Sequence, residues 1–162
     1  MAASETPPPW QIEVRGLCER PAVLGYEALR ALGWMELRSA VRCPAGSGLD
    51  GRLWGGVPLT WLVALCAPTA GARYAIIHSG PYATGFRIDS LDRRCAILAL
   101  AADGRLLDGA SGGPVRLVVA KGACFDMVKA GDAISFEADG SSATAITMVR
   151  RRHNFATGAS QP

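Results

Sequence analysis

The segment Cys95 to Ala101 is apolar at every position, and the dipeptide Asp103-Gly104 follows it. An apolar run of this length predicts a strand that is buried on both faces, and Asp-Gly is a strong signal for a two-residue hairpin turn. The whole chain is 49% hydrophobic and 19% charged, which is typical of a packed globular protein with a sizeable core. A composition of this kind excludes the class of disordered proteins.

Alternating and helical patterns predict the other elements. The apolar positions Trp10, Ile12 and Val14 alternate with polar ones, as in a half-buried strand. Helical spacing follows Pro21 and again Pro58. Further strands are expected at 35–43, 73–78, 84–88, 115–119, 133–138 and 143–149. The predicted fold class is α+β, with a strand-rich mixed sheet or sheets and short helices.

The length of 162 residues fits one domain. We expect a flexible leader at 1–9, a single domain at 10–149 and a basic flexible tail at 150–162. The net charge of +3 is spread along the chain, so nucleic acid is not an expected partner. No apolar run is long enough to span a bilayer, and no export signal is recognised, so a cytoplasmic location is expected.

The five cysteines are widely spaced, with no Cys-x-x-Cys pair and no paired histidines. This spacing disfavours zinc and iron-sulfur sites and indicates free thiols. Cys43 differs from the others because it ends the predicted strand that begins at Met35. The loop Pro44 to Gly51, rich in glycine and small residues, comes directly after it. A thiol where a strand becomes a loop is a candidate for chemistry.

Several segments, taken in order, resemble the sulfite oxidase and molybdopterin-dependent oxidoreductase family. They run from about Trp10 to Phe136, and Lys129 closes the series of matching residues. The matching segments are Trp10 to Gly16, Val41-Arg42-Cys43, Trp54 to Leu59, Tyr74 to Tyr82, Ile97 to Leu100 with Asp103-Gly104, and Gly112 to Val119. The sharpest element is Gly-Gly-Pro-Val-Arg-Leu-Val-Val at 112–119. The resemblance implies a molybdopterin-binding fold, in a short and divergent member of the family.

The resemblance also implies a cofactor and its site residues. The cofactor is molybdenum-molybdopterin (Moco), with Cys43 as the catalytic residue and the thiolate ligand of the metal. Arg116 matches a cofactor-contacting arginine, and Lys129 matches a lysine near the pterin phosphate. His78 and Ser111 fall at positions that could donate hydrogen bonds to the pterin. The alternatives are a buried structural thiol for Cys43 and surface salt bridges for Arg116 and Lys129.

The implied function is that of an oxidoreductase transferring an oxygen atom to or from a small sulfite-like or sulfoxide-like substrate. A separate electron-transfer partner is then required. One alternative is a non-catalytic binding module or partner subunit that has lost the substrate pocket or the cofactor, which the shortened chain and the plain loop after Cys43 favour. Another is a thiol enzyme that uses Cys43 with His78 as its base.

Overall fold

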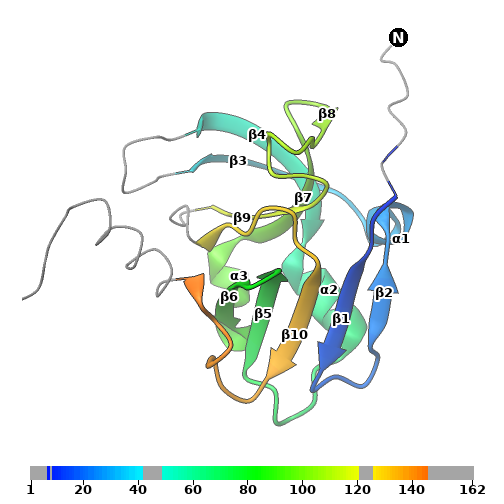
Figure 1. Cartoon of the computed structure of the whole chain (residues 1–162), viewed down its shortest axis with the longest axis vertical. Helices are drawn as coiled ribbons and strands as arrows, with labels where there is room; N and C mark the ends of the chain where they lie inside the picture. Colours follow the sequence, from blue (N-terminus) through cyan, green and yellow to red (C-terminus); the bar gives the residue numbers. More distant parts are fainter. Residues whose placement is uncertain (1–6, 8, 42–48, 121–125, 146–162) are drawn as a thin grey trace, which may run out of the picture.

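Two five-stranded sheets form the framework of the described part of the chain (Figure 1). The structure is a computed structural model that describes residues 7, 9–41, 49–120 and 126–145. The first sheet has the order β2-β1-β10-β5-β6, and the second has the order β3-β4-β7-β8 with β9 paired to β7. The strands are β1 (Ile12–Gly16), β2 (Ala22–Leu24), β3 (Met35–Val41), β4 (Leu49–Pro58), β5 (Tyr74–Ser79), β6 (Tyr82–Arg87), β7 (Ala96–Ala102), β8 (Arg105–Leu106), β9 (Arg116–Val119) and β10 (Ala133–Glu137). The helices are α1 (Tyr26–Ala31), α2 (Leu59–Cys66) and α3 (Leu91–Arg94), and a 3-10 turn, η1 (Ile88–Ser90), precedes α3.

Strand β7 is buried at all seven of its positions, as the apolar run predicts. Its side chains alternate between two hydrophobic clusters. Leu98 and Leu100 belong to the main core, whereas Ile97 and Ala99 belong to a smaller cluster around Trp54. The hairpin after β7 is confirmed too, because Asp103 and Gly104 both have positive φ and Ala102 pairs with Arg105. The strand therefore joins the two halves of the hydrophobic interior.

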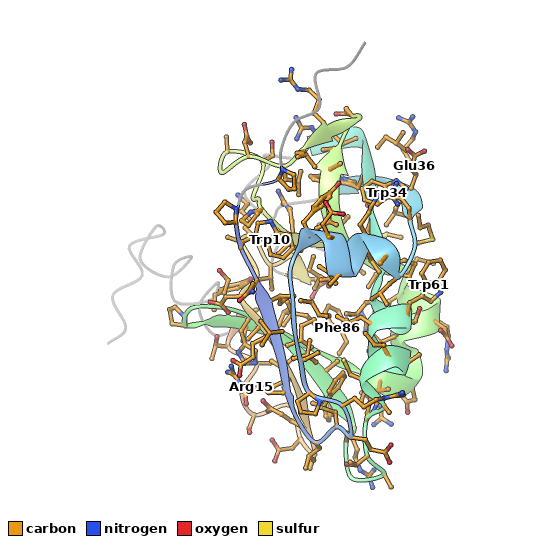
Figure 2. The ribbon with its side chains drawn as sticks, turned by 90° about the vertical axis from the view of Figure 1, so that its right-hand side faces the viewer. Trp10, Arg15, Trp34, Glu36, Trp61 and Phe86 are labelled. Carbon is orange, nitrogen blue, oxygen red and sulfur yellow. The ribbon has the colours of Figure 1, made fainter. Side chains whose placement is uncertain are left out.

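The main core fills the space between the first sheet and helix α2. Ile12 and Val14 of β1 are buried while Glu13 is exposed, which confirms the alternating pattern. In Figure 2, Phe86 lies in the interior, and Arg15 lies on the side of the sheet opposite to α2 and Trp61. The α+β fold class with strand-rich sheets and short helices is confirmed. No helix in the described ranges is both long and apolar enough to cross a membrane.

Two expectations about the strands are wrong. The predicted loop Pro44–Gly51 overlaps β4, which already begins at Leu49. Residues 143–145 of the predicted strand 143–149 are not in a strand, and the remaining residues lie outside the described part. Thr144 instead exchanges hydrogen bonds with Ala83 on the edge of β6, through its backbone amide and its hydroxyl. Those bonds hold this segment against the first sheet without extending it.

Candidate functional site

The loop between β8 and β9 is organised by Asp108. The Asp108 carboxylate accepts a hydrogen bond of 2.7 Å from the Ser111 amide, and its carbonyl accepts one of 2.7 Å from the Gly113 amide. The bond from the Ser111 amide, followed by one from the Ser111 side chain, holds the pKa of the Asp108 carboxyl below its ordinary value. Gly113 has no room for a side chain, because a Cβ would lie 2.4 Å from the Leu107 carbonyl oxygen. The loop conformation is thus fixed by its own backbone.

Arg116 begins β9 directly after this loop, and only 3% of it is exposed. Its Nη1 donates a hydrogen bond of 3.1 Å to the Ser111 carbonyl. Its guanidinium carbon lies 5.2 Å from the centre of the Trp54 ring, a cation–π distance. The alternative of a surface salt bridge does not fit a side chain buried to this degree.

Gly112 brings the loop against Lys129. A Cβ at Gly112 would lie 2.9 Å from the Lys129 Cγ and 3.1 Å from the Arg116 Cδ, and Gly112 has a φ of +88°. The Gly112 carbonyl accepts a hydrogen bond of 2.8 Å from the Ala130 amide. Ser111, Gly112, Arg116 and Lys129 therefore lie together, and we call them the loop site. Lys129 is exposed, so its ammonium group has access to solvent.

The side chain of His78 bonds a residue outside the loop site. Its Nε2 is 2.7 Å from the Ser135 hydroxyl, which donates a bond of 2.5 Å to Glu137. Because that hydroxyl proton is directed to the carboxylate, the Nε2 of His78 carries the proton in this pair. Partial burial is the main cause that lowers the pKa of His78, and the Arg15 charge adds to it.

The backbone of His78 is nevertheless adjacent to the segment that carries Lys129. Its carbonyl accepts a hydrogen bond of 2.9 Å from the Asp132 amide, three residues after Lys129. The structure thus groups three of the predicted binding residues, Ser111, Arg116 and Lys129, and places the backbone of a fourth beside them. Whether these residues bind a cofactor stays a prediction.

Cys43 lies outside the described residues. Strand β3, which leads to it, is present as predicted, with Met35, Leu37 and Ser39 more buried than Glu36 and Arg38. The Ser39 hydroxyl donates to the Ala120 carbonyl at 3.1 Å, so β3 runs past the end of β9. Within the described ranges, no three His, Cys, Asp or Glu side chains are grouped so that they could hold a metal ion.

Sequence reasoning missed two residues that shape the loop site, Trp54 and Asp108. Trp54 is fully buried and donates from its Nε1 to the Ser39 carbonyl at 3.3 Å. The signal for Asp108 was present as an Asp followed by Gly, Ala, Ser and Gly, a composition typical of a side-chain-capped turn. Two other arginines are ion-paired, Arg52 with Asp103 and Arg87 with Asp89.

Comparison with known families identifies the class of protein. Residues 2–144 match the family described as "Oxidoreductase molybdopterin binding domain". The match covers most of the chain, and the chain therefore belongs to this family of molybdopterin-binding domains. The resemblance noted from the sequence is confirmed.

Particular relatives make the comparison more specific. The chain is 30% identical, over 135 residues, to the protein-methionine-sulfoxide reductase catalytic subunit MsrP of Burkholderia mallei (strain ATCC 23344), covering 73% of this chain and 40% of that protein. It is 31% identical over 128 residues to MsrP of Xanthomonas campestris pv. campestris, covering 68% and 39%. Among solved structures, the sulfane dehydrogenase SoxCD from Paracoccus pantotrophus superposes with a TM-score of 0.75 at 19% identity, covering 83% of this chain and 40% of that one. The chain thus spans about two fifths of the length of these relatives.

Proposed function

We propose that this chain is the molybdenum-pterin domain of an oxidoreductase that transfers an oxygen atom to or from a small sulfoxide-like or sulfite-like substrate. The observation that carries the proposal is the buried Arg116, fixed over Trp54 beside a glycine loop and Lys129. The two relatives named as methionine-sulfoxide reductase subunits favour a sulfoxide over sulfite. The match covers 40% and 39% of those two relatives, so their complete reaction is proposed for this chain.

The loop site fits the anionic part of such a cofactor. Gly112 leaves no space for a Cβ between Arg116 and Lys129, so the backbone can approach a ligand closely there. An arginine fork and a lysine point charge are the donors that a phosphate requires. In this proposal Arg116 and Lys129 would hold the phosphate of the pterin. Ser111 and His78 would donate to its ring edge only after giving up their present hydrogen bonds, because the amide and the hydroxyl of Ser111 bond Asp108 and the Nε2 of His78 bonds Ser135.

When bound, the molybdenum-pterin group supplies two-electron oxygen-atom transfer. The chain contributes Cys43 as the thiolate ligand of the metal, and the loop site fixes the group in place. Reduction of a sulfoxide consumes two electrons and two protons and releases water, so a separate electron-transfer partner completes the reaction.

The decisive experiment is elemental analysis of the chain purified from a host that makes the cofactor. We expect close to one molybdenum per chain, together with dye-linked reduction of methionine sulfoxide. Cys43→Ser is expected to abolish this activity and to leave the circular dichroism spectrum and the unfolding midpoint unchanged, because only a thiolate donor is lost. Cys95→Ser, which alters an exposed thiol, is the matched control and should remain active.

The competing proposal is a binding module without catalysis. It predicts molybdenum or pterin in the purified chain but no turnover with methionine sulfoxide or sulfite. Full activity in Cys43→Ser would contradict the ligand role of this cysteine. Activity without molybdenum that is destroyed by thiol alkylation would instead support a thiol enzyme.

A further inference from the structure

A pocket of about 680 Å³ opens at the end of β9 opposite to the loop site. Three arginines line it, Arg87, Arg93 and Arg94, together with Asp89 and Cys95 and the backbone at 119–120. Its volume falls within the range of roughly 300 to 1,000 Å³ that is usual for small-molecule sites. We call it the arginine pocket.

The charge of the arginine pocket is positive. Arg87 donates to both oxygens of Asp89, at 3.1 Å and 2.6 Å, so this pair is close to neutral. Within the described residues, Arg93 and Arg94 form no ion pair, and they leave a surplus of two positive charges at the pocket wall. A concave surface lined by one sign of charge concentrates oppositely charged ligands.

The arginine pocket is held in shape by the packing of α3. Leu91 anchors this short helix in the main core, with only 2% of it exposed. The guanidinium carbon of Arg94 lies 5.5 Å from the centre of the buried Phe86 ring, which limits the positions open to this side chain. Phe86 lies in the interior (Figure 2), so its contact with the exposed Arg94 lies at the edge of the main core.

Cys95 adds a backbone feature at the same place. It ends α3 with a φ of +46°, in the left-handed region that residues other than Gly, Asn and Asp rarely adopt. This conformation turns the chain directly from the two arginines into β7, so both lie beside the end of β9. Unfavourable backbone of this kind is retained where the surrounding structure enforces it, often at binding sites.

The arginine pocket is separate from the loop site. In the pairing of β7 with β9, Val119 lies opposite Ala96 and Arg116 lies opposite Ala99. The two ends of β9 are three residues apart, which corresponds to about 10 Å along a strand. A ligand of the loop site is therefore held by a different set of donors.

We propose that the arginine pocket binds a small molecule through a phosphate or sulfonate group, held by Arg93 and Arg94. The planar fork of a guanidinium matches two oxygens of such a group. The inference is independent of the proposed redox function, because it uses none of the predicted cofactor residues. It adds a second anion site to the domain.

The test uses the full chain, labelled with ¹⁵N, and two probes, inorganic phosphate and methanesulfonate. We expect saturable shifts of the Cys95 and Ala120 amide signals. In Arg93→Gln with Arg94→Gln, phosphate should bind at least about 10-fold more weakly, because two charge-assisted hydrogen-bond donors are lost. Arg30→Gln with Arg73→Gln removes the same charge from exposed positions outside the pocket and should change the affinity by less than about twofold.

A second readout uses the exposed thiol of Cys95. The ratio of its alkylation rate by anionic iodoacetate to that by neutral iodoacetamide should fall in the Arg93/Arg94 variant and stay constant at Cys18. The tighter of the two probes identifies whether phosphate or sulfonate is preferred. Three results would overturn the proposal. Phosphate binding could be weakened equally in both double variants, the shifts could centre on Gly112 and Lys129, or neither probe could give a saturable shift.

Discussion

The loop site and the arginine pocket both gather arginine, and they lie at opposite ends of β9. In the loop site, Arg116 is 3% exposed and is fixed by a carbonyl, a ring and a glycine loop. In the arginine pocket, Arg93 and Arg94 are exposed and are placed by the short helix that carries them. The difference teaches that the two ends of one strand can adjoin different donor sets, one buried and fixed by its partners and the other exposed and carried by a separate helix.

This contrast has an energetic consequence. A buried guanidinium is expensive to desolvate, so its site is retained only with well-placed partners, and removing it disturbs the fold. Exposed arginines cost little to the fold and act mainly through long-range charge, which salt screens. Removing the arginine of the loop site should thus lower both ligand binding and stability, whereas removing those of the arginine pocket should lower ligand binding alone.

The largest effect is expected for Arg116→Ala. Loss of the side chain should reduce molybdenum content roughly 10- to 100-fold, because charge-assisted hydrogen bonds contribute about 1.5–3 kcal/mol. The free energy of unfolding in urea should also fall, by about 2–3 kcal/mol, since a buried group is removed. Arg93→Ala should leave both measurements unchanged. Unaltered molybdenum content in Arg116→Ala would contradict the role of the loop site.

A smaller effect is expected for Gly112→Ala, with two glycines of the chain as matched controls. Gly112 combines a φ of +88° with close contacts to Lys129 and Arg116. Gly104 has a φ of +79° with no atom near its Cβ position, and Gly109 has neither restriction. We expect destabilisation of about 2–3 kcal/mol at Gly112, about 1 kcal/mol at Gly104 and within about 0.5 kcal/mol at Gly109.

Urea unfolding of the three alanine variants measures these differences. Only Gly112→Ala should also lower molybdenum content, since it displaces Lys129 and Arg116. If Gly112→Ala lowers the free energy of unfolding by no more than Gly104→Ala does, the side chains of Lys129 and Arg116 can move aside readily.

The sequence predicted the elements whose signal is local. The buried strand β7 and its Asp103-Gly104 turn follow from an apolar run and a dipeptide, and α2 follows from Pro58 and its helical spacing. Strand β4 was not predicted, because its start was assigned to the loop Pro44–Gly51 and Gly55-Gly56 is not typical of a strand interior. A Cβ at Gly56 would lie 2.1 Å from the Leu98 carbonyl oxygen, so its need for glycine comes from a strand distant in the sequence.

The residues of the candidate site were chosen from the resemblance and their role in binding stays a prediction, whereas their arrangement depends on the fold. The grouping of Gly112 with Arg116 and Lys129 agrees with the residues chosen from the resemblance. The place of Arg116 over Trp54 depends on β4 and β9 both pairing with β7, which no local pattern encodes. The arginine pocket was missed because a four-residue helix such as α3 has too few positions for periodicity to appear.

The smallest effect expected is a difference between two carboxyl groups in how they respond to salt. Hydrogen bonds from Arg87 are the main cause that holds the pKa of Asp89 below its ordinary value of 3.8, and the charges of Arg87 and Arg93 add to them. The pKa of Asp108 is also lowered, chiefly by the Ser111 amide. For both groups the folded pKa is the lower one, so their stabilisation is present above the unfolded pKa and is lost as pH falls through the folded pKa. A salt concentration of 1 M shortens the screening length to about 3 Å. It should therefore raise the pKa of Asp89 more than that of Asp108, as measured in a ¹³C carboxyl titration. Equal rises in the two pKa values would mean that both groups depend on charge to the same extent.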